Sequence, residues 1–200
     1  PEDFSLDDPG LPTPADTSDG AFEVTEEIYY YYVDDPSNDG DEYTPGAIGS
    51  DANTGLTPLK PKASIQAVLD AYDLGEGDVI LVDTGVYTLT SNILISAEDA
   101  GVTIMGPTSG TEAVLNRGNT NAGSYVIQLA SNADDVTLSH LTITGARYGI
   151  YAGDNMDVDN LRVEESEIRD NSQHGVYVGY GSTGTSNDDA EFENLKVHDS

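Results

Sequence analysis

The sequence predicts an all-β protein in which a solenoid of parallel β-strands, a parallel β-helix, follows one capping α-helix. Three observations predict this fold. The chain contains many short β-favouring runs, some of them recur at a spacing of about 25 residues, and a single amphipathic segment precedes most of the runs. An antiparallel sandwich is the alternative, but hairpin signals of the Asn-Gly type are missing between adjacent runs.

Residues 1–27 are expected to form a flexible acidic arm or linker. The segment is rich in Asp, Glu and Pro and poor in apolar residues. Such a composition cannot bury enough apolar surface to offset the entropy of ordering the chain. The remaining residues, 28–200, are expected to form one β-helix domain, with a cap over 28–77 and coils over 78–200.

The cap is expected to contain an aromatic strand, a long loop and a helix. Residues 28–33 are aromatic and β-favouring, and the turn-rich segment 34–58 follows them. The expected helix spans 63–72, where apolar residues at i, i+3, i+4 and i+7 form one stripe. The stripe consists of Ile65, Val68, Leu69 and Tyr72.

The coils are expected to consist of short strands separated by Gly, Asn and Asp. The expected strands are 78–82, 86–89, 92–95, 102–105, 125–129, 136–143, 149–152, 158–163, 166–168, 175–178 and 192–197. Internal matches predict how they stack. Residues 135–138 match 160–163 at an offset of 25, Ile143 matches Ile168 at the same offset, and 149–153 match 175–179 at an offset of 26.

A longer offset relates the last two repeats. Residues 160–166 recur at 194–200 with an offset of 34, and the excess falls in the insertion 179–191. The sequence ends inside this repeat, so we expect further coils or a neighbouring chain to cover the C-terminal end. The alignment makes two pairs equivalent, Arg162 with Lys196 and Asn160 with Asn194.

The charge of the chain is strongly negative. Asp and Glu number 37 against 7 Lys and Arg, which gives a formal net charge of −30. A field of this sign repels nucleic-acid phosphates and anionic membrane surfaces, so no nucleic-acid partner is expected. No apolar run approaches the roughly 20 residues of a membrane span, so no membrane insertion is expected. The absence of cysteine excludes disulfides and thiolate metal sites.

Residues 49–90 resemble the N-terminal cap of the pectate-lyase-like superfamily of right-handed parallel β-helices. The matching motifs are Asp51-x-Asn53-x-Gly55, Pro58 and Pro61, Ser64-Ile65-Gln66, Gly77-Asp78-Val79-Ile80 and Gly85-Val86-Tyr87. The resemblance implies right-handed coils, a helix that closes their N-terminal end, and a secreted or cell-surface location. Many members are lyases or epimerases of acidic polysaccharides, and others are adhesins or surface fibres.

No catalytic residue is predicted. A polysaccharide lyase needs a cation that neutralises the uronate and a base that removes a proton, often Lys or Arg in the resembling family. Arg162 and Lys196 are candidates, but we favour their interpretation as solvated strand residues. A catalytic carboxylate pair of the glycosidase type is not predicted, because chance pairs of carboxylates are expected in so acidic a chain. The acidic residues considered are Glu164, Glu165, Glu167 and Asp170. The three histidines, His140, His174 and His198, share no repeat position and therefore predict no metal cluster or catalytic triad.

Oxygen-rich loops predict calcium binding in the cap. Asp35, Asp39 and Asp41 lie at alternate or nearby positions around a glycine, like the start of a Ca²⁺ loop, although Gly46 stands where a bidentate Glu is expected. Asp51 and Asn53 form a second, shorter cluster, and 187–189 form a weaker third. The alternative for each is a turn held by Asp and Asn side-chain hydrogen bonds.

We therefore expect a non-catalytic structural or adhesive module of a larger secreted or cell-surface protein, with polysaccharide or other surface proteins as partners. Tyr151 and Tyr177 share one repeat position and are expected to point outward, where they could contact a sugar. Simple cross-strand stacking is the alternative for this pair. The alternative function is the N-terminal part of a polysaccharide lyase or epimerase.

Overall fold

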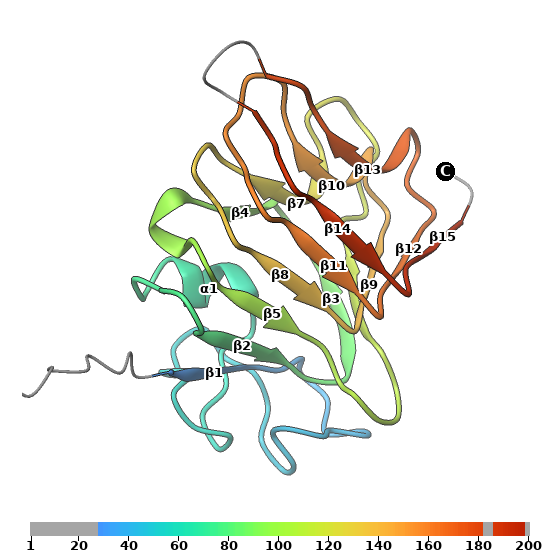
Figure 1. The fold of residues 1–200 in the computed structure, drawn as a ribbon. Coiled ribbons are helices and arrows are strands. Elements are labelled where there is room, and N and C mark those ends of the chain that lie inside the picture. Colours follow the sequence, from blue (N-terminus) through green and yellow to red (C-terminus); the bar gives the residue numbers. More distant parts are fainter. Residues whose placement is uncertain (1–27, 182–185, 199–200) are drawn as a thin grey trace, which may run out of the picture.

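Parallel β-sheets make up most of the structure, a computed structural model that describes residues 28–181 and 186–198 (Figure 1). The arm predicted for 1–27 lies outside the described residues. Sheet A contains β1 (Tyr30–Val33), β2 (Val79–Val82), β5 (Thr103–Met105), β8 (Thr137–Ser139), β11 (Arg162–Glu164) and β14 (Glu191–Glu193). Sheet B contains β3 (Gly85–Thr88), β6 (Ala113–Asn116), β9 (Leu141–Thr144), β12 (Glu167–Arg169) and β15 (Lys196–Val197). Sheet C contains β4 (Ile93–Ile95), β7 (Tyr125–Leu129), β10 (Tyr148–Ala152) and β13 (His174–Val178).

From β2 onward, successive strands enter sheets A, B and C in rotation, so that each sheet stacks every third strand. We call one such set of three strands a three-strand repeat. Every paired strand runs parallel to its neighbour. The all-β class is confirmed, and the arrangement is compatible with a parallel β-helix.

The predicted register at offsets of 25 and 26 is confirmed. Leu138 pairs with Val163, and Ile143 pairs with Ile168. In sheet C, Tyr151 pairs with Tyr177. The inward positions of each repeat therefore stack on those of the next, and the apolar side chains form continuous buried columns. One column of sheet A consists of Ile80, Ile104, Leu138 and Val163, all fully buried.

The predicted offset of 34 is wrong. Arg162 pairs with Glu191 in sheet A, whereas Lys196 pairs with Glu167 in sheet B, so the two basic residues are not equivalent. Asn160 and Asn194 likewise occupy different corners, one before a strand of sheet A and the other before a strand of sheet B. Both have positive φ, 56° and 49°, which Asn tolerates better than most residues. The similar runs therefore share a corner conformation, not a place in the repeat.

The same backbone conformation divides a segment predicted as one strand. Residues 136–143 form two strands in different sheets because His140, with φ of 55°, turns the chain between β8 and β9. Glu165 and Asn194 turn the chain at the matching corner of later repeats. A further strand, β6, was not predicted at all, since its run Ala-Val-Leu-Asn is short and apolar without alternation.

The helix α1 (Ile65–Leu69) is shorter than the predicted 63–72. The side chain of Ser64 accepts a hydrogen bond from the Ala67 amide and begins the helix. The predicted apolar stripe faces the core, since Ile65, Val68 and Leu69 are buried. The helix contacts β1, β2 and β4, at the end of the stack where the first strands lie.

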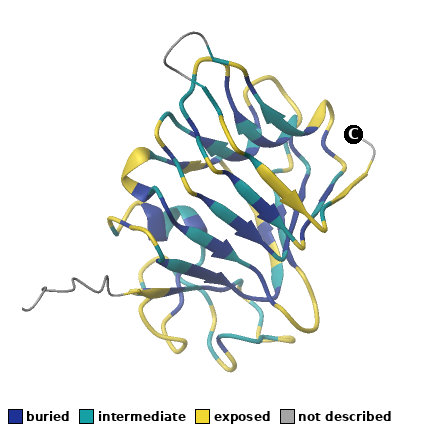
Figure 2. Ribbon diagram, viewed as in Figure 1, coloured by how far each residue is buried: buried dark blue, intermediate teal, exposed yellow. Residues whose placement is uncertain are grey.

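The opposite end of the stack leaves inward positions open. Phe192 pairs with the buried Val163 but is 47% exposed, and Val197 pairs with the buried Ile168 but is 56% exposed. Figure 2 shows the exposed strand β14 beside the buried strands of the earlier repeats. Among the described residues, the last strand of each sheet, β14, β15 or β13, thus has no neighbour on its outer side.

Candidate functional site

A cluster of three aspartates lies where the first two strands of sheet A end. Asp34 directly follows β1 and Asp83 directly follows β2. Because these strands pair in parallel, with Val33 opposite Val82, the two aspartates come to the same edge. Asp41 reaches them from the loop that follows β1, and one carboxylate oxygen of each aspartate lies within 4.8 Å of the others.

Asp83 is held by a set of backbone donors. Its Oδ1 accepts hydrogen bonds from the amides of Glu42 and Thr84, both at 2.7 Å. Its Oδ2 accepts bonds from the Tyr43 amide at 2.8 Å and from the amide and hydroxyl of Thr44 at 2.6 and 2.8 Å. These donors tie the loop after β1 to the end of β2.

Asp34 and Asp41 have no comparable partners. All four of their carboxylate oxygens are buried and lack a hydrogen bond of good geometry. Burial, and then the charge of Asp41, raise the pKa of Asp34 to about 7. The Thr44 hydroxyl and the Asp35 amide lie near the Asp34 carboxylate and oppose this rise in pKa, but the hydroxyl donates its proton to Asp83. Burial and the charge of Asp83 also raise the pKa of Asp41. Unpaired buried carboxylates of this kind are costly in a folded protein.

The three aspartates of the cluster lack a basic ion-pair partner among the residues that the structure describes. In the described ranges 28–181 and 186–198, no Lys, Arg or His forms an ion pair with any of the three aspartates. The backbone is also closely packed around Asp34, because a Cβ atom at Gly49 would lie 1.8 Å from its carbonyl oxygen. The cluster is therefore a rigid, electronegative site.

The first predicted calcium loop contributes one residue to this site. Asp41 belongs to the cluster, whereas the carboxylate of Asp35 accepts hydrogen bonds from the amides of Ser37 and Val86. Asp39 is exposed. Sequence reasoning missed Asp34 and Asp83 as candidates. Their signal was the position of each Asp immediately after an apolar strand, which identifies a site only once the two strands are known to be neighbours.

The second predicted loop already holds a positive group of its own chain. The ammonium of the buried Lys62 donates to the carbonyl oxygens of Asp51 and Asn53 at 3.2 and 3.0 Å. The Asp51 carboxylate accepts bonds from the Ala63 amide and the Ser64 hydroxyl, and the Asn53 amide donates to Pro61. These bonds favour the interpretation of this loop as a structural turn.

The third oxygen cluster is also engaged in local bonds. The Asn187 side chain donates to the carbonyl oxygens of Gly153 and Gly179, at 3.3 and 2.7 Å. The Asp188 carboxylate accepts a bond from the Ser186 hydroxyl. The bond from Asn187 to Gly153 connects the described end of the insertion to the preceding repeat.

A stack of aromatic rings covers the outer side of sheet C. The Tyr151 ring lies 4.0 Å from the Tyr125 ring and 5.5 Å from the Tyr177 ring, measured between centroids. In each pair the ring planes are nearly parallel, so the rings are stacked. Tyr148 stacks on Tyr151 and on His174, at 5.5 and 5.3 Å. The rings thus use their faces on one another, as cross-strand stacking requires. Contact of Tyr151 and Tyr177 with a sugar stays a prediction. Because the ring faces stack on one another, such a contact would use mainly the ring edges.

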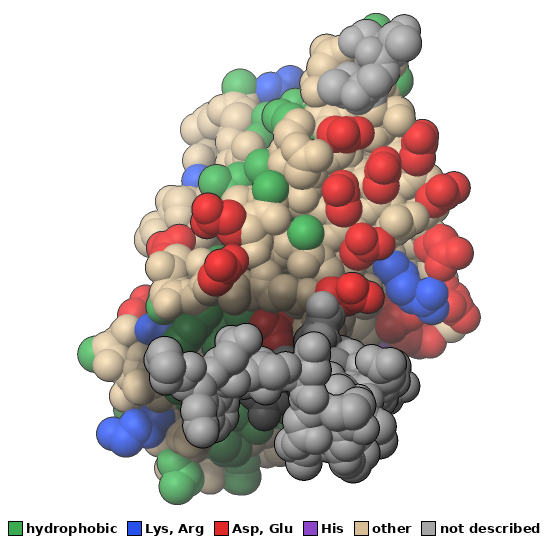
Figure 3. Space-filling view, turned by 60° about the vertical axis from the view of Figure 1, so that its left-hand side comes forward, with side chains coloured by type: hydrophobic (Ala, Val, Ile, Leu, Met, Phe, Trp, Pro, Cys, Tyr) green, Lys and Arg blue, Asp and Glu red, His purple; other side chains and the backbone are tan. Residues whose placement is uncertain are grey.

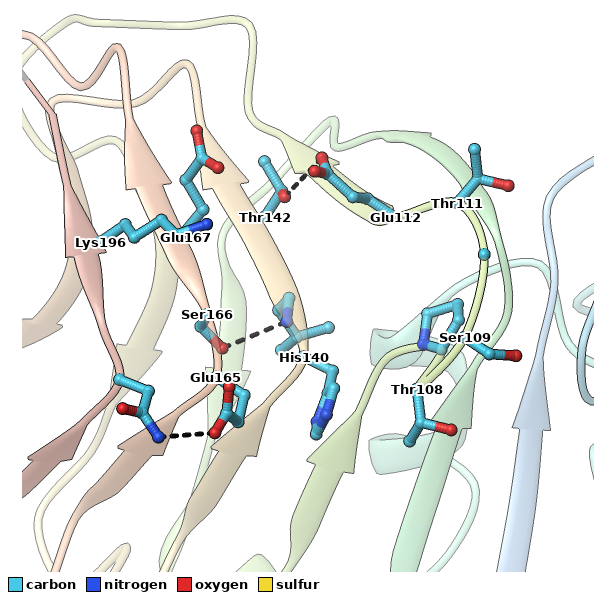
Figure 4. Close-up of a pocket in the computed structure, with 14 residues that line it drawn as sticks. Thr108, Ser109, Thr111, Glu112, His140, Thr142, Glu165, Ser166, Glu167 and Lys196 are labelled. Atoms are coloured by element: carbon cyan, nitrogen blue, oxygen red, sulfur yellow. Dashed lines mark hydrogen bonds between the residues drawn. The ribbon is translucent and has the colours of Figure 1, made fainter.

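A groove of about 190 Å³ lies along the corner between sheets A and B. Figure 4 shows the loop after β5 on one side and residues from three later repeats on the other. Hydroxyl groups and three carboxylates dominate its lining. The carboxylates are already engaged: Glu112 accepts a bond from Thr142, Glu165 accepts one from Asn194, and Glu167 contacts Arg169. Lys196 reaches across Glu167 at one end of the groove (Figure 4).

The guanidinium groups near the end of the stack are neutralised in place. Arg162 contacts Glu164 at 2.7 Å and both Glu191 and Glu193 at 3.0 Å. Arg169 contacts Asp170 at 3.0 Å. Exposed ion pairs of this kind add little stability, but they commit these two guanidinium groups to side chains of the protein itself. Figure 3 shows the excess of Asp and Glu over basic side chains on one face.

Comparison with known proteins identified no relative. The sequence matches no protein-family model, and neither the curated proteins nor the solved structures include a match to this chain. Within the described part of the chain, no helix has the length and apolar character that crossing a membrane requires.

Proposed function

We propose that this chain is a non-catalytic structural or adhesive module of a larger secreted or cell-surface protein. The observation that supports this best is the neutralisation of Arg162 by three carboxylates. A lyase for acidic polysaccharide needs an uncommitted positive group beside its substrate. Here the guanidinium of Arg162 forms its ion pairs with acidic side chains of the protein itself.

The module would be a right-handed parallel β-helix with α1 as its N-terminal cap. The rotation of strands through three sheets and the buried stripe of α1 support this architecture. Handedness and the extracellular location rest on the resemblance of residues 49–90 to the pectate-lyase-like superfamily. In such a module each coil supports the next, so the outer surface is rigid.

A neutral polysaccharide fits the groove better than an acidic one. Its side-chain hydroxyl and amide groups can exchange hydrogen bonds with sugar hydroxyls, whereas its three glutamates oppose a polyuronate. Its volume is below the roughly 300–1,000 Å³ of pockets that enclose a small ligand. A sugar would therefore lie along the corner and remain partly exposed to water.

One observation favours the enzyme alternative. Lys196 lines the groove and has no ion pair among the described side chains. A lysine beside a sugar-sized groove is the residue type that removes a proton in the resembling lyases. In that alternative, the groove would hold the uronate and Lys196 would act as the base.

An absorbance assay for unsaturated uronate products separates the two functions. We expect no product from several polyuronates, with or without Ca²⁺, and measurable retention of the protein on at least one insoluble neutral polysaccharide. Product formation by the wild-type chain that Lys196→Ala abolishes would establish the enzyme and contradict the proposal.

A further inference from the structure

We infer that the aspartate cluster is a binding site for one divalent cation of the Ca²⁺ type, with Asp34 and Asp41 as direct ligands and Asp83 as an adjacent fixed negative charge. The inference is independent of the proposed function, because it concerns how the first strands and the following loop are held together. It also moves the expected ion from the exposed turn at Asp35 and Asp39 to the interior.

The spacing of the carboxylates suits one ion. Oxygen ligands lie about 2.4 Å from Ca²⁺, so two ligands on opposite sides of the ion are separated by at most about 4.8 Å. The three carboxylates each offer an oxygen within 4.8 Å of the others. An ion between them would have ligands from the end of β1 and from the loop that follows it, next to the end of β2.

The missing hydrogen bonds identify the ligands. Asp34 is completely buried and both its oxygens lack a partner, as do both oxygens of Asp41. Each oxygen of Asp83, by contrast, already accepts two or three hydrogen bonds. The unused lone pairs therefore belong to Asp34 and Asp41, which makes them the direct ligands. Asp83 adds charge at close range, where the interior screens it weakly.

A shared proton is the competing explanation. A proton on Asp34 would neutralise one charge and allow one hydrogen bond to Asp41. It would leave the remaining buried lone pairs unsatisfied, whereas a cation can accept oxygens from both carboxylates at once. The two explanations differ in one measurable respect, since only the cation makes stability depend on Ca²⁺.

Thermal unfolding of the chain in Ca²⁺ and in EDTA tests the inference. Both samples contain 1 M NaCl and have the same ionic strength, so that general charge repulsion is screened equally. The wild-type chain should melt about 5 °C or more higher when Ca²⁺ is a hundredfold above its Kd. The variants Asp34→Asn and Asp41→Asn should lose this shift and weaken Ca²⁺ binding at least tenfold in calorimetric titration. In EDTA they should melt at or above the wild type, because the amides remove charge repulsion.

Two matched variants serve as controls, each removing one negative charge from a predicted loop. Asp39→Asn lies in the same loop as Asp41 and should keep the full Ca²⁺ shift. Asp51→Asn should lower stability equally in both conditions, since it weakens bonds to Ala63 and Ser64. Should Asp34→Asn fail to fold, the partly exposed Asp41 still provides the decisive variant.

Three results would overturn the inference. Identical wild-type melting in Ca²⁺ and EDTA would leave the shared proton as the explanation. Equal Ca²⁺ shifts in all four variants would show general screening of an acidic protein. Loss of the shift in Asp39→Asn, with Asp34→Asn unaffected, would place the ion in the exposed loop.

Discussion

At the scale of single residues, the carboxylate of Asp34 is completely buried and both its oxygens lack a hydrogen bond of good geometry. Its neighbours are the carboxylates of Asp41 and Asp83 and the hydroxyl of Thr44. Burial, and then the charge of Asp41, raise the pKa of Asp34 to about 7, so that in the metal-free protein a proton neutralises this carboxylate below that pH. The residue therefore couples the stability of the metal-free protein to pH.

The sign of this coupling follows from the raised pKa. The folded protein keeps the Asp34 proton in the range from about pH 4 to about pH 7, where the unfolded chain releases it. The contribution is fully present below pH 4 and is lost as the pH rises toward 7, by at most about 1.4 kcal/mol per pH unit. In EDTA, the wild type should therefore lose stability relative to Asp34→Asn as the pH rises. The free energy of unfolding of the variant minus that of the wild type should increase.

Urea unfolding of both proteins at pH 5 and pH 7.5 measures this difference. The comparison cancels the carboxylates that the two proteins share, apart from Asp41, whose charge raises the pKa of Asp34. A stability difference that stays constant between the two pH values would show that Asp34 titrates normally in the folded protein.

At the scale of elements, the sequence predicts those features of the fold that depend on a single strand or on a single repeat spacing. The offset of 25 placed Leu138 beside Val163 because both positions face the interior and the intervening turns have equal length. The offset of 34 failed because Asn at a left-handed corner looks alike before sheets A and B. Local pattern fixes the corner but not the sheet that follows it.

The site was only partly predictable for a related reason. Asp41 was found through its oxygen-rich loop, whereas Asp34 and Asp83 are 49 residues apart in sequence and meet only through the pairing of β1 with β2. The local sequence around Lys62 does not indicate that its ammonium group donates hydrogen bonds to carbonyl oxygens of the second predicted calcium loop. Both features depend on long-range contacts of the first strand and its loop.

The helix α1 gives an element-scale prediction. Ile65 is fully buried against the first strands, so Ile65→Ala should lower the free energy of unfolding by about 2–5 kcal/mol through lost burial and a cavity. Asp73→Ala, an exposed change just after the helix, should have an effect within about 0.5 kcal/mol. Similar urea midpoints for the two variants would show that the helix does not seal the interior.

At the scale of the whole molecule, the net charge of −30 acts on every part of the fold. Self-repulsion destabilises the compact state, and salt shortens its range from about 10 Å at 0.1 M to about 3 Å at 1 M. The melting temperature in EDTA should therefore rise between 0.1 and 1 M NaCl, in the wild type and in Asp41→Asn alike. A fall over this range would mean that exposed ion pairs such as those of Arg162 outweigh the repulsion.

The proposed cation site requires β1 and β2 to pair in parallel, so that Asp34 and Asp83 come together with Asp41 around one ion. The decisive measurement is a crystal structure of the chain grown with Tb³⁺ in place of Ca²⁺, in which the anomalous signal locates the ion. We expect one strong anomalous peak about 2.3–2.6 Å from oxygens of Asp34 and Asp41, at the shared edge of parallel strands. A cluster without a peak, or antiparallel pairing of β1 with β2, would contradict the proposed site.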